Sequence, residues 1–363
     1  MRVLIFSHEF PPDIGGAGVV AQQNAKALAE AGNDVTVLTR NRKINVENEL
    51  IYSVKRVHTY GKLWFLTYKY AVDFSDYDLI VLNDPASIYV AGLFFNKETF
   101  DKTIAFLHGS EPELIYQKRS LFQVITFFKF FYTSALAKVK HIVSVSYFMK
   151  EKFLNRTKLH FLSSKIVVNY AGIDNKLFSP DHKGKLKKEL SIPQNSQLLI
   201  SVSRLVRNKG YPEMLNIFEK ILTVDNEFYW IVIGSGDYLE DFKKEIKIRK
   251  LESHIFLIGS KKRNELRYYY SNSDVFWLLS NYEESFGLSY LEAQACGIPA
   301  IGLNKYGVKE AISVDTGFLI DSPDDIFEVL VDKKYKNILP STLKRFSDSF
   351  SNDRLAIKLL DLM

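Results

Sequence analysis

The segment VFWLLSNYEESFGLSYLEAQACGIPAIGL, residues 275–303, combines a strand pattern, a loop, a helix and a second strand pattern. Five apolar residues, 275–279, are followed by a polar loop, and residues 288–297 have helical spacing that ends at a glycine. The run 299–303 is apolar again. A strand, a helix and a second buried strand form the repeat of a doubly wound parallel sheet. The segment therefore predicts an α/β fold.

The same alternation occurs in two blocks along the chain. The apolar runs of the first block are VLIFS (3–7), DVTVLT (34–39), LIVLN (79–83), TIAFLH (103–108) and HIVSVS (141–146). Those of the second block are LLISVS (198–203), YWIVIGS (229–235), IFLIGS (255–260), VFWLL (275–279) and PAIGL (299–303). We predict two Rossmann-like domains, each a doubly wound parallel sheet, that face each other across a cleft lined by the loops after the strands.

The length of 363 residues also favours two domains, because a single hydrophobic core rarely supports a chain of this size. We expect the first domain at residues 1–178 and the second at 179–350, with the polar, lysine-rich stretch 179–195 at their junction. The amphipathic segment 351–363 is expected to be a helix that packs back on the first domain.

Composition excludes several classes of protein. The only cysteine, Cys296, rules out an internal disulfide and a cysteine-rich zinc site. We see no targeting segment and no apolar run long enough to span a membrane, so a cytoplasmic location is expected. The net charge of +6 lies on residues 1–178, and residues 114–170 hold ten basic residues with one acid, Glu151.

That basic region has two interpretations. Phe122, Ile125, Phe128 and Tyr132 have helical spacing and are interrupted by lysines. The segment is either a core helix with solvated basic faces or an interfacial helix that contacts an anionic membrane. Nucleic acid is a less suitable partner, because no nucleic-acid-binding module is recognisable.

The loops after the second block of strands carry the candidate binding residues. Arg204, Arg207 and Lys209 follow the strand 198–203 with no acid among them, which suits a phosphate or pyrophosphate; the alternative is a solvated basic turn. Gly234 and Gly236 form a tight turn after the next strand, where backbone can approach a ligand closely.

Glu284 and Glu292 stand on either side of an expected helix start. The N–H groups near residues 286–289 would offer an anion site. Eight helical residues rise about 12 Å, which is too far for two carboxylates that share a proton. They can instead reach two hydroxyl-bearing parts of one ligand whose anionic part lies between them. A nucleotide sugar has this order of groups, namely sugar, diphosphate and ribose.

The motifs in this order resemble those of retaining glycosyltransferases of the GT-B fold, family 4. The E-x7-E segment is ESFGLSYLE (284–292), and the resemblance extends over most of the chain. Its other parts are FPPDIGGAG (10–18), NYAGID (169–174) with Phe178 and Pro180, SRLVRNKGY (203–211), GVKE (307–310) and TGFL (316–319).

The resemblance implies roles for residues of the second domain. Arg204 and Lys209 would hold the donor diphosphate and stabilise the departing nucleotide in place of a metal ion. Glu292 would accept from the ribose hydroxyls, and Glu284 would bind the donor sugar. The backbone amides of Phe286, Gly287 and Leu288 would contact the sugar and the phosphate.

In the first domain, the resemblance implies that Gly16 lies against the diphosphate and that His108 contacts the donor sugar. The other interpretation of His108 is a buried histidine bonded to backbone. The implied activity is that of a hexosyltransferase that retains anomeric configuration and needs no metal and no other cofactor. Its acceptor would be a hydroxyl of a glycan or of a lipid-linked molecule. The implied setting is the synthesis of bacterial surface polysaccharide (O-antigen or capsule) or of glycolipid, at the inner face of the membrane.

Two other functions are compatible with parts of the sequence. Residues 16–21 match G-x-G-x-x-A and could indicate an NADP-dependent oxidoreductase, although eight residues, 8–15, lie between the first strand and Gly16. That hypothesis also leaves the second domain unexplained. A protein that binds nucleotide sugars without turnover is the second alternative.

Overall fold

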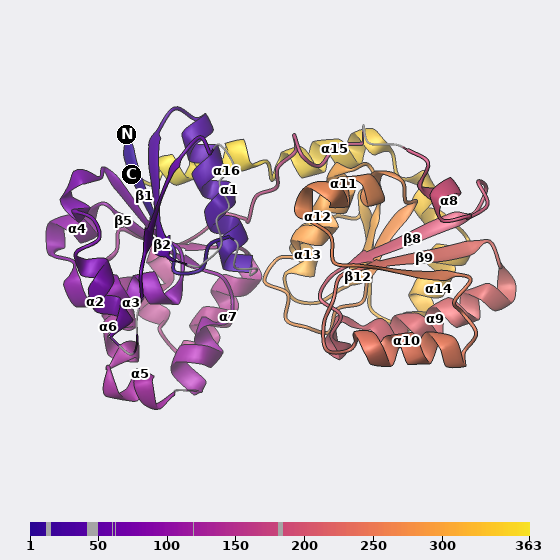
Figure 1. Cartoon of the computed structure of the whole chain (residues 1–363), viewed down its shortest axis with the longest axis horizontal. Helices are drawn as coiled ribbons and strands as arrows, with labels where there is room; N and C mark the ends of the chain where they lie inside the picture. The colour runs from indigo at the N-terminus through magenta and orange to yellow at the C-terminus, as the bar shows by residue number, and fades with distance from the viewer. Residues whose placement is uncertain (12–15, 42–49, 60, 62, 119, 181–183) are drawn as a thin grey trace. The chain divides into compact units, whose positions relative to one another are not determined.

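The computed structural model describes residues 1–11, 16–41, 50–59, 61, 63–118, 120–180 and 184–363. The predicted glycine-rich loop 10–18 and the junction 179–195 therefore lie partly outside the described residues. The chain divides into two compact units (Figure 1), Met1–Gly172 with Asn352–Met363, and Ile173–Ser351. The second unit begins six residues before the predicted boundary, and Phe178 packs in it against Tyr270, with 6.1 Å between ring centroids.

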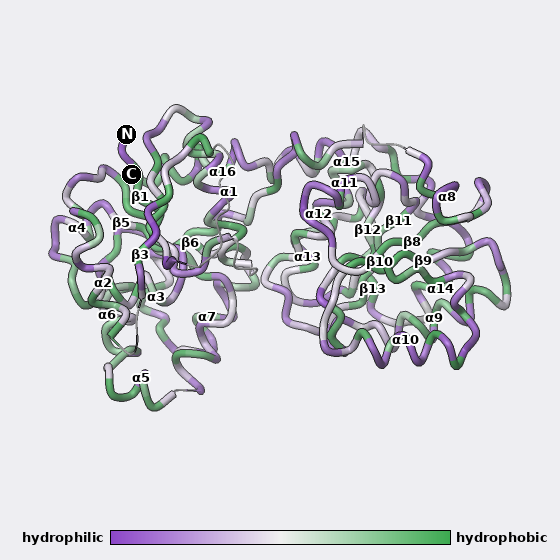
Figure 2. Tube along the Cα trace, viewed as in Figure 1, coloured by the Kyte–Doolittle hydropathy of each residue, from purple (hydrophilic) through white to green (hydrophobic). Residues whose placement is uncertain are grey.

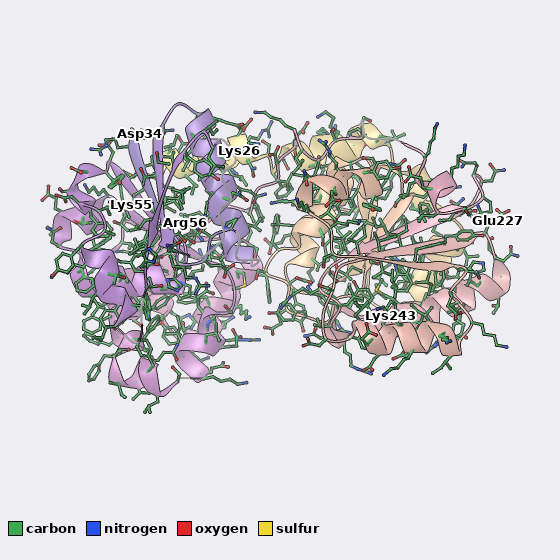
Figure 3. All side chains as sticks on the ribbon, viewed as in Figure 1. Lys26, Asp34, Lys55, Arg56, Glu227 and Lys243 are labelled. Carbon is green, nitrogen blue, oxygen red and sulfur yellow. The ribbon has the colours of Figure 1, made fainter. Side chains whose placement is uncertain are left out.

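The first unit contains a seven-stranded parallel sheet with the order β3-β2-β1-β4-β5-β6-β7. Its strands are β1 (Arg2–Phe6), β2 (Asp34–Arg40), β3 (Ser53–Val57), β4 (Leu79–Leu82), β5 (Thr103–Leu107), β6 (His141–Ser144) and β7 (Ile166–Val168). The five strands expected from apolar runs are present, and β3 and β7 were not predicted. Both are edge strands, which lack the continuous apolar run of a central strand; β3 carries Lys55 and Arg56, labelled in Figure 3.

Helices surround this sheet. They are α1 (Gly16–Glu30), α2 (Trp64–Lys69), α3 (Pro85–Phe94), α4 (Lys97–Asp101), α5 (Leu121–Ile125), α6 (Phe128–Lys138), α7 (Tyr147–Thr157) and α16 (Asn352–Leu360), with short η1 (Phe74–Asp76), η2 (Pro112–Gln117) and η3 (His160–Lys165). The last helix, α16, packs against α1, so the two ends of the chain lie together in this unit (Figure 1). Asn169 donates to the carbonyl oxygen of Leu355 on α16 at 3.1 Å.

The second unit contains a six-stranded parallel sheet with the order β10-β9-β8-β11-β12-β13. Its strands are β8 (Gln197–Val202), β9 (Phe228–Ile233), β10 (Ile255–Gly259), β11 (Val275–Leu278), β12 (Ala300–Leu303) and β13 (Gly317–Ile320). Its helices are α8 (Leu186–Glu189), α9 (Tyr211–Val224), α10 (Leu239–Ile248), α11 (Arg263–Ser271), α12 (Leu288–Ala295), α13 (Val308–Ala311), α14 (Pro323–Val331) and α15 (Pro340–Asp348), with η4 (Arg207–Lys209) and η5 (Lys334–Asn337). The prediction of two parallel α/β domains is confirmed.

Both sheets are buried between helices, as parallel sheets generally are. In the second unit β8, β9 and β10 are largely hydrophobic (Figure 2); β8 and β9 are almost fully buried, and the edge strand β10 is mostly half-buried. There Trp230 of β9 and Trp277 of β11 are fully buried, with ring centroids 4.8 Å apart. Burial raises the pKa of the Cys296 thiol to about 12, so this cysteine is a buried, protonated side chain.

None of the helices in the described residues has the length and apolarity needed to cross a membrane.

Candidate functional site

Glycines hold the strand-end loops of the second unit against one another. Gly210, with φ +84°, follows the β8 loop, and a Cβ there would lie 2.0 Å from the carbonyl oxygen of Leu279 after β11. A Cβ on Gly234, with φ +140°, would lie 1.9 Å from the carbonyl oxygen of Ser203. Gly236 is similarly close to the same loop. The neighbouring loop therefore requires glycine at positions 234 and 236. From the sequence we expected these glycines to let the backbone approach a ligand, which is a different reason.

Within these loops, Lys209 and Glu284 form a buried ion pair. Lys209 ends η4 after β8, and Glu284 lies between β11 and α12. The Nζ of Lys209 donates to Oε1 of Glu284, and the two side chains are only 11% and 14% exposed. The same Nζ lies 5.0 Å from the ring centroid of Tyr282. The structure thus joins two predicted site residues that are 75 positions apart in the chain.

Two of the three cations of the β8 loop have acidic partners, whereas the sequence suggested that all three were uncompensated. Besides Lys209, Arg207 is paired: its guanidinium lies 3.9 Å from carboxylate oxygens of Asp241 and Glu245 on α10 and stacks over Tyr238. Arg204 is exposed and forms no ion pair with any residue that the structure describes. Of the three, Arg204 is the cation open to an incoming anion.

Glu292 is held in a second buried pair that the sequence did not reveal. Its Oε1 accepts from the Arg263 guanidinium at 2.7 Å, and Oε2 accepts from the Tyr270 hydroxyl at 3.4 Å. Burial raises the pKa of the Glu292 carboxyl, and the Arg263 charge opposes that rise. Arg263 begins α11 shortly after β10, so its place in the KKRNEL segment after a strand was the available signal.

The start of α12 separates the two carboxylates, as predicted. Gly287 caps the helix with φ +101°, and the N–H groups of Leu288 and Ser289 lie too early in the helix to have an acceptor within it, whereas Tyr290 donates to the Gly287 carbonyl oxygen at 3.1 Å. Phe286 is 2% exposed and packs on Phe350, so its ring anchors the loop. An anion between Glu284 and Glu292 would meet the positive end of this helix.

In the first unit, His108 follows β5 and is fixed by backbone and carboxylate contacts. Its Nε2 lies 2.7 Å from the carbonyl oxygen of Asn83, and because a carbonyl only accepts, this nitrogen carries the proton. Buried Glu111 accepts from the backbone N–H groups of His108 and Gly109 at 2.6 and 2.7 Å. Burial lowers the pKa of His108, and the Glu111 charge opposes that shift.

Asn83, which the sequence analysis did not single out, connects His108 to the start of α1. Its side-chain amide donates to the carbonyl oxygen of Ala17 and to the hydroxyl of Ser7, both at 2.9 Å. Gly16 lies beside Ala17 at the helix start, and no described atom comes within 4 Å of the place its Cβ would take. The elements that carry Gly16 and His108 are therefore linked by one hydrogen-bonded residue.

Comparison with known proteins identifies the family. Residues 14–177 match the model of "Glycosyltransferase Family 4", and residues 182–336 match that of "Glycosyl transferases group 1". The chain belongs to this family of glycosyltransferases.

Individual relatives agree with this assignment. The chain is 27% identical over 331 residues to N-acetyl-alpha-D-glucosaminyl L-malate synthase of Bacillus anthracis, covering 86% of this chain and 82% of that protein. It is 30% identical over 200 residues to the O-antigen biosynthesis glycosyltransferase WclY of Escherichia coli, which is 54% of either chain. The chain thus spans about half the length of that relative.

The fold also matches solved glycosyltransferases. The crystal structure of Anabaena Alr3699/HepE in complex with UDP and glucose superposes with a TM-score of 0.79 at 17% identity, covering 99% of this chain and 98% of that one. The fold is therefore GT-B, as predicted.

The Arg263–Glu292 pair gives a first testable expectation. We expect Arg263→Met to lower the free energy of unfolding at neutral pH by about 2 kcal/mol, because it leaves a buried carboxylate unpaired. The pKa of Glu292 is already raised, and loss of the cation raises it further. The loss in free energy of unfolding is therefore absent at pH values below about 4, the pKa of the carboxyl group in the unfolded chain, and it grows as the pH rises. Urea unfolding at several pH values measures it.

Two controls accompany that measurement. Arg249→Met breaks a 2.7 Å pair with the more exposed Glu219 and should cost about 0.5 kcal/mol. Adding Glu292→Gln to Arg263→Met should recover most of the loss. A loss that does not depend on pH, or that remains in the double variant, would show that Arg263 stabilises the fold by packing alone.

The contact at Gly210 gives a second expectation. Gly210→Ala combines a left-handed backbone with a collision against the Leu279 carbonyl, so it should cost about 3 kcal/mol. Gly32→Ala is the matched control, because Gly32 has φ +83° but no described atom within 4 Å of its Cβ position, and should cost about 1 kcal/mol. Equal losses in the two variants, measured by chemical denaturation, would refute the role of the loop contact.

Proposed function

We propose that this protein transfers a hexose from a nucleotide-sugar donor to an acceptor hydroxyl, with retention of configuration and without a metal ion or other cofactor. The observation that carries the proposal is the pair of carboxylates, mostly buried Glu284 and buried Glu292, set on either side of the α12 start and each paired with a cation. Family membership supports it, as does the position of Lys209 and Glu284 on loops that follow strands.

In this proposal the donor lies along the start of α12. Glu292, already bonded to Arg263 and Tyr270, accepts from the ribose hydroxyls, and the N–H groups of residues 286–288 donate to the phosphate and sugar. Exposed Arg204 binds the diphosphate. For Gly16 of the first unit, whose Cβ position has no described atom within 4 Å, we propose a role in donor binding.

Lys209 has two potential partners in this site. Before donor binding its charge is neutralised by Glu284. A bound diphosphate would compete for the same Nζ and release the Glu284 carboxylate to accept from a sugar hydroxyl. The binding energy of the donor would thus be used partly to reposition these two groups, and the pair keeps either charge from being buried alone beforehand.

The chemical step then needs stabilisation of the leaving group. The bond between the anomeric carbon and the diphosphate oxygen breaks, the nucleoside diphosphate keeps the electron pair, and the acceptor oxygen bonds to the anomeric carbon as its proton is released. Arg204 and Lys209 stabilise the charge that develops on the diphosphate, which lowers the barrier directly. For His108 we propose contact with the donor sugar, since its protonated Nε2 is committed to Asn83 and fixes the ring.

For the acceptor we propose a hydroxyl of a glycan or of a lipid-linked molecule, handled by the first domain on the cytoplasmic side of the cell membrane. WclY acts in O-antigen biosynthesis, and another relative is an alpha-monoglucosyldiacylglycerol synthase of Streptococcus pneumoniae, 20% identical over 313 residues. The basic region 114–170 suits a molecule held at an anionic membrane. The setting implied by the sequence, surface polysaccharide or glycolipid synthesis, is our proposal for this chain.

A thermal-shift panel with UDP, GDP, ADP and NADPH tests the donor class. A nucleoside diphosphate at about 100 times its dissociation constant should stabilise the protein by about 2.7 kcal/mol, which is readily measured. We expect one of the three diphosphates to raise the melting temperature, and UDP is the first to try because HepE was crystallised with it. A shift with NADPH alone would replace the transferase by the oxidoreductase hypothesis.

Site variants test the residues with whichever diphosphate gives the largest shift. Lys209→Met and Glu292→Gln should each weaken binding by about tenfold or more, because each loses a charged partner of the ligand. Arg207→Met is the matched control: it removes a cation of the same loop that is already paired with α10, and should change affinity by about twofold at most. Isothermal titration measures all three, and unchanged affinity in both site variants would reject the assignment.

A further inference from the structure

The helix α5 exposes an apolar surface. Its sequence is LFQVI, and none of its five residues is buried. Leu121 and Ile125 are 76% and 66% exposed, and the following Phe127 and Phe130 are 68% and 66% exposed. Large apolar side chains gathered on one exposed tip, as opposed to scattered singly, mark an interaction site. We call Leu121, Val124, Ile125, Phe127 and Phe130 the α5–α6 surface.

The chain bends at the centre of this surface, where the sequence suggested one helix. Phe127 has a left-handed backbone, φ +50°, which separates α5 from α6. Left-handed backbone at a bulky residue is uncommon and is concentrated at functional positions. The bend divides the aromatics of the region: Phe128 and Tyr132 enter the core, whereas Phe127 and Phe130 point outward. The core interpretation of the basic region thus fits α6, and the interfacial one fits α5 and the bend.

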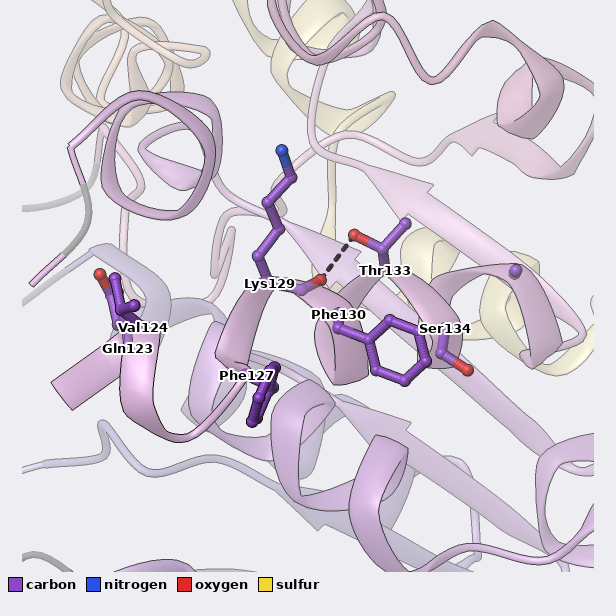
Figure 4. A pocket seen from close by; sticks show the side chains of 8 residues that line it. Gln123, Val124, Phe127, Lys129, Phe130, Thr133 and Ser134 are labelled. Carbon is purple, nitrogen blue, oxygen red and sulfur yellow. Dashed lines mark hydrogen bonds between the residues drawn. The ribbon is translucent and has the colours of Figure 1, made fainter. Parts of the chain in front are cut away.

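Beside the exposed rings there is a hollow of about 610 Å³. Val124, Phe127 and Phe130 line it together with the small side chains of Thr133, Ser134 and Ala137 (Figure 4). Thr133 directs its hydroxyl at the Lys129 carbonyl oxygen, 2.7 Å away, so it adds no unpaired donor to the lining. Gln123 and Lys129 also line the hollow, but its surface is mostly apolar, and it is large enough for part of a hydrocarbon chain.

The segment that carries the surface is basic. Residues 114–150 contain six basic residues and no aspartate or glutamate. Lys118 and Lys129 are exposed, and Lys129 extends away from Phe127, with its Nζ 5.0 Å from the ring centroid of Tyr116 (Figure 4). A second copy of this chain would place two such basic regions together, which is unfavourable. An anionic lipid surface is complementary both to the cations and to the exposed rings.

We infer that the α5–α6 surface docks on an anionic lipid bilayer, with Phe127 and Phe130 inserted at the boundary between headgroups and acyl chains and an acyl segment seated in the hollow. Lysines nearby contact the headgroups. This deepens the membrane-facing part of the proposed function, but it concerns binding alone and needs no glycosyl transfer.

Vesicle co-sedimentation tests the inference with the full chain. Wild type should bind vesicles of phosphatidylglycerol and phosphatidylcholine more tightly than vesicles of phosphatidylcholine alone. The double variant Phe127→Ser, Phe130→Ser should lower the partition coefficient by about tenfold or more, since two exposed rings no longer enter the bilayer. Phe161→Ser is the matched control, because Phe161 is 65% exposed on the same unit but lies outside the surface, and it should bind like wild type.

Lysine variants test the electrostatic contribution to vesicle binding. Lys118→Gln with Lys129→Gln should weaken binding more than Lys97→Gln with Lys102→Gln, which changes the net charge equally on other elements. Equal vesicle binding by the wild type and the double phenylalanine variant would overturn the inference. Analytical ultracentrifugation gives a second test: a wild-type dimer that becomes monomeric in the double variant would also overturn it. If the protein does not bind vesicles but a nucleoside diphosphate still raises its melting temperature, this inference fails while the proposed function holds.

Discussion

The close contact between strand-end loops is the constraint on which the candidate site depends. A parallel sheet delivers the loops after its strands to one edge, but it does not fix their distance from one another. In the second unit the distance between the loops is set at Gly210, Gly234 and Gly236, where the backbones of neighbouring loops are in close contact. A side chain at any of these positions would collide with a neighbouring carbonyl, so the loops would separate. The positions of Lys209 and Glu284, one on each of two such loops, follow from this packing.

The electrostatics of the site follow from burial. A carboxylate removed from water is costly unless a cation and hydrogen bonds replace the lost hydration. Glu284 and Glu292 therefore each have a basic partner, Lys209 and Arg263, drawn from different strand-end loops. The same pairing leaves exposed Arg204 as the cation of the β8 loop without an ion pair among the described residues. The two ion pairs are neutral on balance, and together with Arg204 they offer a ligand several charged groups whose partners can be exchanged.

The first unit uses its polar residues differently. Here Asn83 and Glu111 fix the ends of strands and the start of α1 by hydrogen bonds to backbone, and His108 is oriented as part of that network. Hydrogen bonds in a buried network of this kind hold its members in place, although Oδ1 of Asn83 has no hydrogen-bond partner among the described residues. On another part of the same unit, α5 and the bend at Phe127 place large apolar side chains in water. One unit thus combines a fixed polar edge with a surface whose composition favours an apolar partner.

The sequence by itself determined the fold class and the location of the candidate residues on strand-end loops. Buried parallel strands are continuous apolar runs, and ten of the thirteen strands that the structure describes were recognised in this way. The strand β3 contains two charged residues, β7 has only three residues, and β13 is a four-residue edge strand that is half-buried at its centre, so each gives a weaker signal. Motif order was enough to indicate the family.

Tertiary structure decided which charges meet. Arg263 and Glu292 are 29 positions apart, Lys209 and Glu284 are 75 apart, and Asp241 reaches Arg207 from another helix. No local pattern reports such pairs, because they depend on the register of neighbouring strands and on loop contacts as short as those at Gly210. The break at Phe127 was likewise invisible, since the helical spacing of residues 122–132 continues through it. Periodicity records which face a residue would take on an ideal helix, whereas packing determines where the helix ends.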